Sequence, residues 1–187
     1  MNKLKSKSRF MLLLCTLFAG CQDGSSLPAI VPVPQVELTR FMGSWYVLAC
    51  IPTVIEHDIY NAQESYSTNA DGTIATTFSF NQGGPEGKQK TYHPVGYVKP
   101  DSGNAVWGMQ FIWPIRAEYL ITYLDQDYSR TIIARNARDY VWIMARSPSI
   151  PQQEYDDLVA RVAALGYDTS KLVKISHVQH NNNESQL

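Results

Sequence analysis

The chain has 187 residues, a length that suits a single domain of ordinary size. Hydrophobic residues make up 44% of it and charged residues 18%, a balance that excludes a disordered chain. The formal net charge of −1 provides no basic surface field, which argues against nucleic acid as a partner.

The first twenty residues have the layout of a secretory signal peptide. Four basic residues lie within the first nine positions, and an apolar run over residues 10–18 follows. That run is too short to span a membrane comfortably as a helix. The small residues Ala19 and Gly20 then precede Cys21. We therefore predict a signal peptide over residues 1–20 that is removed from the mature chain.

The residues before Cys21 resemble the lipobox of bacterial lipoproteins, with Phe18 where leucine is usual. The resemblance implies that Cys21 becomes the mature N-terminus and carries a lipid that anchors the chain to a membrane. In lipoproteins of Gram-negative bacteria, an aspartate after the lipidated cysteine favours retention in the inner membrane, so Gln22 at this position implies the outer membrane. With Cys21 lipidated, Cys50 has no disulfide partner, and we expect a buried, unreactive thiol. An ordinary secreted chain and a Cys21–Cys50 disulfide are the alternatives.

Residues 21–37 are predicted to form a flexible, lipid-anchored tether. This stretch is rich in glycine, serine and proline, and proline fixes φ and removes a backbone donor. Regular periodicity begins at Leu38, so we place the folded domain at residues 38–178. The last residues, 179–187, are polar and are expected to fray.

Most of the domain is predicted to be strand. Apolar and other residues alternate with period two over 74–80, 106–113, 119–124 and 140–145. Turn sequences rich in glycine, asparagine and aspartate separate these runs. We predict an all-β fold of about eight strands joined by hairpins. Because closure removes exposed edges, the arrangement favoured is an up-and-down antiparallel barrel, although an open sandwich fits the same pattern.

One helix is predicted near the C-terminus. The sequence from Ser149 to Gln152 resembles a capping box with proline in the first turn, and Gly166 provides a stop. Four apolar residues share one helical face: Tyr155, Leu158, Val159 and Val162. We expect this helix to pack outside the barrel, followed by a short strand from Leu172 to Val178.

Three sequence motifs resemble those of the lipocalin family. Gly43-Ser44-Trp45-Tyr46 resembles the G-x-W motif that opens the first lipocalin strand, where the tryptophan closes one end of the barrel. Residues 139–146 resemble the last barrel strand with its arginine, here Arg146, which covers that tryptophan through a cation–π contact. The turn at residues 124–128 resembles the family's T-D-Y turn without its threonine. With these motifs and the lipobox, the chain resembles the bacterial lipocalins of the Blc type, which are outer-membrane lipoproteins. The resemblance implies structural roles for Gly43, Trp45, Tyr46 and Arg146.

An eight-stranded barrel is wide enough to hold one small ligand, and the resemblance implies a fatty acid or lysophospholipid. Arg116 and His93 are candidates to contact its head group. We expect no cofactor and no metal, and a homodimer is left open. Eight bulky side chains are predicted to line the interior and bind the ligand: Phe78, Phe80, Trp107, Met109, Phe111, Tyr119, Tyr123 and Trp142.

Catalytic motifs are not evident in the sequence, which contains no G-x-S-x-G, H-E-x-x-H or C-x-x-C pattern. The prediction is therefore a binding protein for lipid storage or transport in the cell envelope, not an enzyme. One alternative is an isomerase acting on a lipid-like ligand, because Glu56-His57-Asp58 lies in the loop expected at the barrel mouth. Another is a ligand-free envelope scaffold with a filled core.

Overall fold

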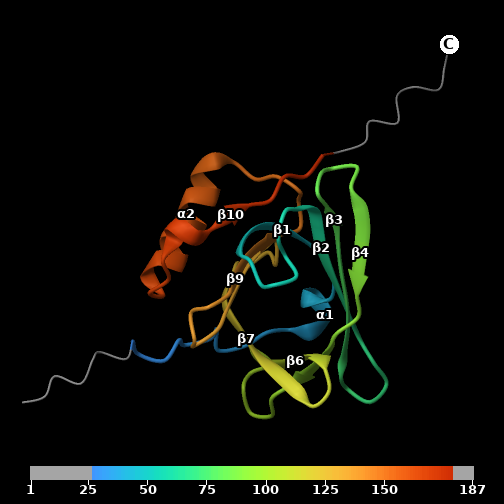
Figure 1. Cartoon of the computed structure of the whole chain (residues 1–187). Coiled ribbons are helices and arrows are strands. Elements are labelled where there is room, and N and C mark those ends of the chain that lie inside the picture. The colour runs from blue at the N-terminus through green and yellow to red at the C-terminus, as the bar shows by residue number, and fades with distance from the viewer. Residues whose placement is uncertain (1–26, 179–187) are drawn as a thin grey trace, which may run out of the picture.

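The structure, a computed structural model, describes residues 27–178 (Figure 1). The predicted signal peptide, Cys21 and the polar tail at residues 179–187 lie outside the described residues. Among the helices within residues 27–178, none is long and apolar enough to cross a membrane.

Ten strands of the described residues form one antiparallel sheet that closes on itself through pairing of β1 with β9. Both β4 and β5 pair with β3, so they act as one barrel strand interrupted at residues 93 and 94. Strand β10 is added beside β1. The predicted eight-stranded barrel is therefore confirmed. The strands are β1 Gly43–Ile51, β2 Ile59–Thr68, β3 Ile74–Gln82, β4 Lys88–Tyr92, β5 Val95–Val98, β6 Val106–Ile112, β7 Ile115–Leu124, β8 Arg130–Ala134, β9 Val141–Ala145 and β10 Val173–Lys174.

Strand β1 shows why the short final strand is needed. Its first residues, Gly43–Tyr46, pair with β2, whereas the second half of β1 does not pair with β2. There Ala49 and Cys50 pair with β10, which covers backbone groups that β2 no longer reaches. Beyond β10, the amide of Ile175 still donates to the Leu48 carbonyl over 2.9 Å. The observed strand is shorter than the predicted run to Val178.

The predicted helix is α2, Gln152–Ala164, and it packs on the outside of the barrel (Figure 1). Leu158 and Val162 are buried against the outward side chains of β1, β8 and β9. The predicted capping box does not form, because the residue before the helix is Pro151, which has no side-chain hydrogen-bonding group. Gly166 follows the helix with a φ of +89°, the conformation expected of a helix stop. A short 3₁₀ helix, Thr169–Lys171, leads into β10.

The segment expected to be a free tether is bound to the barrel from residue 28 onward. We call residues 28–36 the N-terminal strap. Its amides at Ile30, Val33 and Val36 donate to Asn136 Oδ1, the Ile121 carbonyl and the Gly103 carbonyl, over 2.7, 2.8 and 2.7 Å. The prolines do prevent helix and strand here, as expected. These three amides find acceptors on the barrel instead, and the side chains of Ile30 and Val36 are buried. A four-residue helix that the sequence analysis missed, α1 Leu38–Phe41, follows the strap.

Candidate functional site

One end of the barrel is closed by packed aromatic rings. Trp45 of β1 is fully buried, and its indole N–H donates to the Phe41 carbonyl over 2.9 Å. The Phe41 ring lies 5.1 Å from Trp45 and 5.5 Å from Trp107, measured between ring centroids. Trp107 in turn stacks on Tyr119 at 5.1 Å. These rings leave no room for a ligand at this end.

Arg146 joins the parts of this closed end. Its guanidinium lies 3.8 Å above the Trp45 ring, a cation–π contact. The same group donates to the carbonyls of residues 40, 41, 42 and 44 over 2.7–3.0 Å. Three of these carbonyls lie at the end of α1 and its cap, where a short helix leaves acceptors unpaired. Gly43 has a φ of +89°, a backbone conformation that residues with a side chain rarely adopt, and a Cβ there would be in ordinary contact with Arg146 Nη1 at 3.4 Å. Tyr46 instead faces outward, edge-on to His177.

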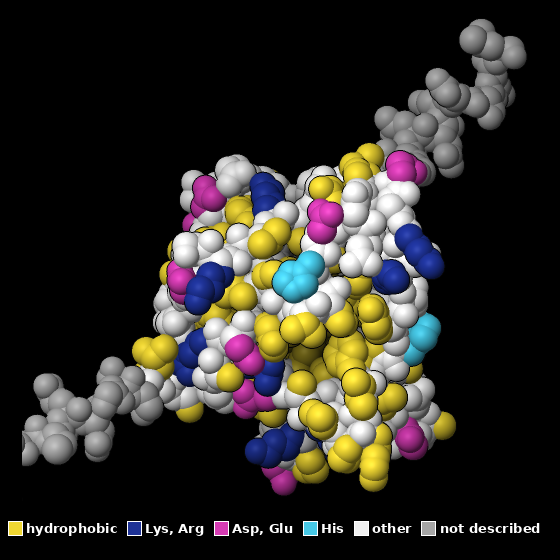
Figure 2. Space-filling view, in the orientation of Figure 1, with side chains coloured by type: hydrophobic (Ala, Val, Ile, Leu, Met, Phe, Trp, Pro, Cys, Tyr) yellow, Lys and Arg dark blue, Asp and Glu magenta, His cyan; other side chains and the backbone are white. Residues whose placement is uncertain are grey.

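The other end of the barrel contains a cavity of about 380 Å³, a volume typical of small-molecule sites. Its wall comes from β2, β3, β4, β6, β7 and β9 and from the β1–β2 and β8–β9 loops. Figure 2 shows hydrophobic side chains surrounding a hollow in this face. Three apolar residues of the lining are also exposed at its rim: Val54, Phe111 and Ile112. The site is therefore apolar both in its wall and around its entrance.

Five of the eight predicted lining residues lie on the cavity wall: Phe78, Met109, Phe111, Tyr119 and Trp142. Two others are buried elsewhere in the interior. Phe80 packs on the Phe78 ring at 5.2 Å, and Trp107 belongs to the closed end.

The prediction that Tyr123 lines the interior is wrong, because Tyr123 lies on the outer face of the barrel. The pairing of β7 with β8 shifts by one residue between Ile121 and Tyr123, and such a bulge reverses the inward and outward alternation. Ile121 therefore belongs to the interior cluster, whereas Tyr123 packs with the outer cluster under α2. The Arg161 guanidinium lies 4.4 Å above the Tyr123 ring.

Neither predicted head-group contact lines the cavity. Arg116 lies over the Tyr97 ring at 3.4 Å, and His93 meets the Thr77 hydroxyl at 3.3 Å on the surface. Among the described residues, the cation that lines the cavity is Arg135 of the β8–β9 loop. Its Nη1 donates to Asp139 over 3.0 Å, but its buried Nε has no hydrogen-bond partner in this part of the chain.

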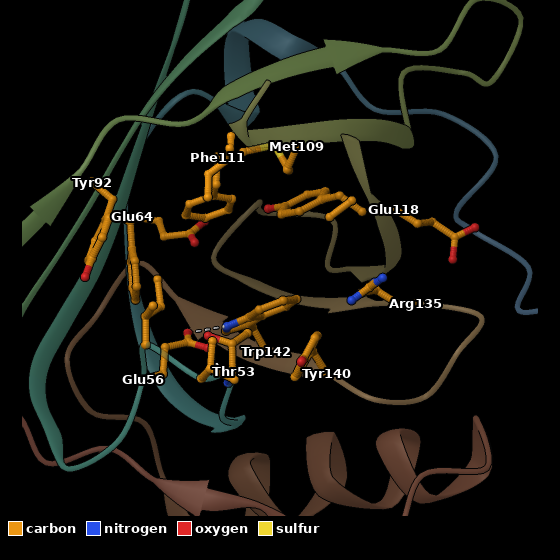
Figure 3. A pocket seen from close by; sticks show the side chains of 16 residues that line it. Thr53, Glu56, Glu64, Tyr92, Met109, Phe111, Glu118, Arg135, Tyr140 and Trp142 are labelled. Atoms are coloured by element: carbon orange, nitrogen blue, oxygen red, sulfur yellow. Dashed lines mark hydrogen bonds between the residues drawn. The ribbon is translucent and has the colours of Figure 1, made fainter. Parts of the chain in front are cut away.

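The cluster Glu56-His57-Asp58 is divided by the fold. Glu56 is 4% exposed and lines the cavity, whereas His57 and Asp58 are exposed and do not. The Trp142 indole N–H donates to one carboxyl oxygen of Glu56, and the Thr53 amide donates to the other, both over 2.8 Å (Figure 3). The three residues therefore do not act together on a bound ligand, as the isomerase alternative requires.

Glu64 is the cavity residue that the sequence analysis missed. It lies on the inward face of β2, between Ala62 and Tyr66, and is 8% exposed. The Tyr66 hydroxyl donates to its carboxyl group, and the Tyr66 and Tyr119 hydroxyls lie 2.7 Å apart. Burial, together with the charge of Glu56, raises the pKa of Glu64 to about 8. Period-two alternation from Ala62 to Tyr66 is the signal that predicts this inward position, whereas the register shift between Tyr60 and Gln63 breaks the alternation earlier in the strand.

Cys50 is fully buried in the interior and has no disulfide partner among residues 27–178. Burial raises the pKa of this thiol above its usual range, with a smaller contribution from Glu56. Because the thiolate is the reactive form, Cys50 is chemically inert here.

A closed antiparallel barrel, sealed at one end and hollow at the other, defines a class of proteins that bind small hydrophobic molecules inside the barrel. The lipocalin-like domain family matches residues 36–177, and the chain belongs to this family. Its membership indicates that the cavity binds a small hydrophobic ligand, and lipocalins are in general binding proteins rather than enzymes.

Several curated proteins are similar to this chain over most of their length. Temperature-induced lipocalin-1 of Arabidopsis thaliana is 30% identical over 76% of this chain and 80% of its own. Outer membrane lipoprotein Blc of Vibrio cholerae is 25% identical over 89% of this chain and 96% of its own, and the Citrobacter freundii protein of the same name is 25% identical over 84% and 88%. The likeness to solved structures concerns the fold alone: insecticyanin from Manduca sexta superposes with a TM-score of 0.64 at 17% identity, over 81% of this chain and 86% of that one.

Proposed function

We propose that this protein is a lipid-anchored lipocalin that binds a fatty acid or a lysophospholipid in the barrel cavity, for lipid storage or transport in the cell envelope. The observation that carries the proposal is the cavity of about 380 Å³ whose apolar wall continues into an exposed apolar rim. A filled scaffold is disfavoured by the same cavity.

The apolar wall supplies the binding energy for an alkyl chain. Burial of each methylene is worth about 0.8 kcal/mol, so ten methylenes give about 8 kcal/mol before other costs. The ordering of the ligand and the loss of its free translation reduce this value, so we expect micromolar affinity. Arg135 stands where an anionic head group would leave the cavity, and its buried Nε has no partner among the described residues. Arg135 thus takes the role of contacting the head group, which the sequence predicted for Arg116 and His93.

Native mass spectrometry of the protein titrated with oleate and lysophosphatidylcholine tests the proposal. We expect a one-to-one adduct with either lipid and displacement of one lipid by the other. Ala117→Trp places a bulky ring in the cavity wall and should abolish the adduct. Ala75→Trp makes the same change on the outward face of β3 and should leave the adduct intact. No adduct on the folded wild-type protein would contradict lipid binding.

The anchor and the location are supported by the lipobox before Cys21 and by relatives whose name is outer membrane lipoprotein. We expect the mature chain to carry the mass of a lipid on Cys21 and to sediment with outer membranes. Cys21→Ser should move the protein into the soluble fraction, and retention of this variant in the membrane would contradict the anchor. The homodimer stays a prediction, which light scattering of the purified protein tests through its mass.

A further inference from the structure

Two buried carboxyl groups enter the cavity, and neither is paired with a cation in the described residues. Glu64 and Glu56 are 8% and 4% exposed, and both reach the same space from different elements (Figure 3). None of the ion pairs within residues 27–178 includes either carboxyl group. Arg135, the cation at the cavity, is already paired with Asp139. The interior therefore carries acidic groups without a counter-charge.

Such an arrangement is costly for the empty protein. Removing a carboxylate from water is unfavourable unless a cation and hydrogen bonds replace the lost hydration. The raised pKa of Glu64 reflects this cost, since burial favours its neutral form. A cation that arrived with a ligand would remove the cost.

Glu64 also has a hydrogen-bond acceptor available at the cavity. The Tyr66 hydroxyl occupies one of its carboxyl oxygens, and the other oxygen has no hydrogen-bond partner in the described part of the chain. Each oxygen of Glu56 has one donor, from Trp142 and from Thr53, and keeps a lone pair. The two carboxyl groups can thus accept hydrogen bonds from a ligand without breaking those that they already have.

We infer that the cavity selects amphiphiles that carry an ammonium group, with the nitrogen facing Glu64 and Glu56 and the alkyl chain against the apolar wall. This inference rests on the proposed function in one respect, that the cavity takes an alkyl chain. An ammonium offers three donors and one positive charge, which match two carboxyl groups. As Glu64 ionises towards pH 8, it repels a carboxylate in the same position, so fatty acids then bind less well or only with their head group outside.

Proton release accompanies this binding. Below pH 8 the empty cavity holds Glu64 largely protonated, and the ammonium favours the ionised carboxylate. Affinity for an ammonium ligand therefore rises as the pH increases towards 8. A primary alkylamine stays charged over this range, because its pKa resembles that of lysine, near 10.4. The other ionisable groups that line the cavity or adjoin Glu64 are Glu56, Tyr66, Tyr92, Glu118, Tyr119, Arg135 and Tyr140.

Three ligands with the same ten-carbon chain test the inference: decylamine, decanol and decanoate. Binding is followed at pH 8 by calorimetry and by intrinsic tryptophan emission, to which Trp142 on the cavity wall contributes. We expect decylamine to bind at least tenfold more tightly than decanol, and decanoate to bind most weakly. Decylamine should bind at least tenfold more weakly at pH 6 than at pH 8, while decanol should change less than threefold.

Glu64→Gln keeps the shape of the side chain and removes its charge, so it should weaken decylamine binding at least tenfold and leave decanol binding within threefold. Glu37→Gln is the matched control, because Glu37 is an exposed carboxylate before α1 at the closed end and is not part of the cavity lining. It should change neither affinity by more than threefold. If Glu64→Gln does not fold, Glu56→Gln provides the same comparison.

The possible outcomes distinguish failure of the ammonium inference from failure of the proposed function. Equal affinities for the three ligands, or tightest binding of decanoate, would overturn the ammonium inference while leaving chain binding in place. Insensitivity of decylamine binding to the folded glutamine variant would overturn it as well. Failure of all three ligands to bind the folded protein would remove the proposed function together with the inference.

Discussion

The closed and open ends of the barrel treat their polar groups in opposite ways. At the closed end, Arg146 donates to four carbonyls of residues 40–44, and the Trp45 indole N–H donates to one of the same carbonyls, that of Phe41. At the open end, Glu64 keeps an oxygen without a partner and Arg135 keeps a buried Nε without one, within the described residues. Buried polar groups are normally satisfied by the chain itself. The difference indicates that the closed end stabilises the fold and that the open end is arranged for a molecule from outside.

The largest effect is expected from the same substitution made at the two ends. Trp45→Ala removes a fully buried ring and should lower the free energy of unfolding by about 3–5 kcal/mol. Trp113→Ala removes a side chain that is 82% exposed beyond β6 and should change it by less than about 0.5 kcal/mol. Urea denaturation gives both values. Similar losses for the two variants would erase the distinction between the ends.

Arg146→Lys sharpens the comparison by keeping the charge and removing the planar group. Lysine cannot reproduce the several parallel hydrogen bonds, so we expect a loss of about 3 kcal/mol in the free energy of unfolding. Arg135→Lys at the open end affects one partly exposed ion pair and should cost at most about 1 kcal/mol. Equal costs in urea denaturation would show that Arg146 does not organise its end of the barrel.

The N-terminal strap offers a smaller test near the closed end. A Cβ on Gly103 would lie 2.0 Å from the Pro34 carbonyl oxygen, and the φ of Gly103 is +58°. Gly103→Ala should therefore displace the strap and cost about 2 kcal/mol, with faster protease cleavage near residue 34. Gly72→Ala has a similar φ of +82° but no atom within 4 Å, so its cost should stay near 1 kcal/mol. Unchanged proteolysis of the Gly103 variant would contradict the proposed role of this contact.

The smallest expected effect is a pH dependence from Glu64. The folded chain keeps Glu64 protonated up to about pH 8, whereas the unfolded chain releases that proton near its ordinary pKa of 4.5. The stability from neutral Glu64 is thus complete below pH 4.5 and is lost as the pH rises to 8. Relative to Glu64→Gln, the wild type should lose about 1 kcal/mol between pH 6 and pH 7. A constant difference between the two proteins across this interval would argue against a neutral Glu64.

The barrel could be predicted from sequence because its signals are local. Alternating runs, turn residues and the paired motifs around Trp45 and Arg146 each reflect contacts between neighbouring strands or a short list of residue types. The error at Tyr123 has a different origin, since one inserted residue in β7 reverses every later side chain while the sequence alternation continues.

The polar part of the site was harder to predict than its wall. Glu56 is adjacent in sequence to two exposed residues, and only the fold of the loop separates it from them. Glu64 occupies an inward position that ordinarily holds an apolar side chain. Its carboxyl group accepts from the Tyr66 hydroxyl, which in turn meets the hydroxyl of Tyr119, 53 residues away from Tyr66 in the chain. Such long-range pairings are not encoded in local periodicity.

The strap also determines how far the barrel could stand from an anchoring membrane. Its first residues are held by the β8–β9 loop, since Arg138 donates to the Pro28 carbonyl and Asn136 accepts from Ile30. That loop contributes Arg135 and Tyr140 to the cavity. In a chain anchored at Cys21, six residues lie between Cys21 and Pro28, so the contour length between these two residues is at most about 25 Å. The segment between Cys21 and Pro28 would therefore be short and would join the barrel beside the cavity entrance. A ligand leaving the bilayer would then travel less than the diameter of the barrel domain before it was bound.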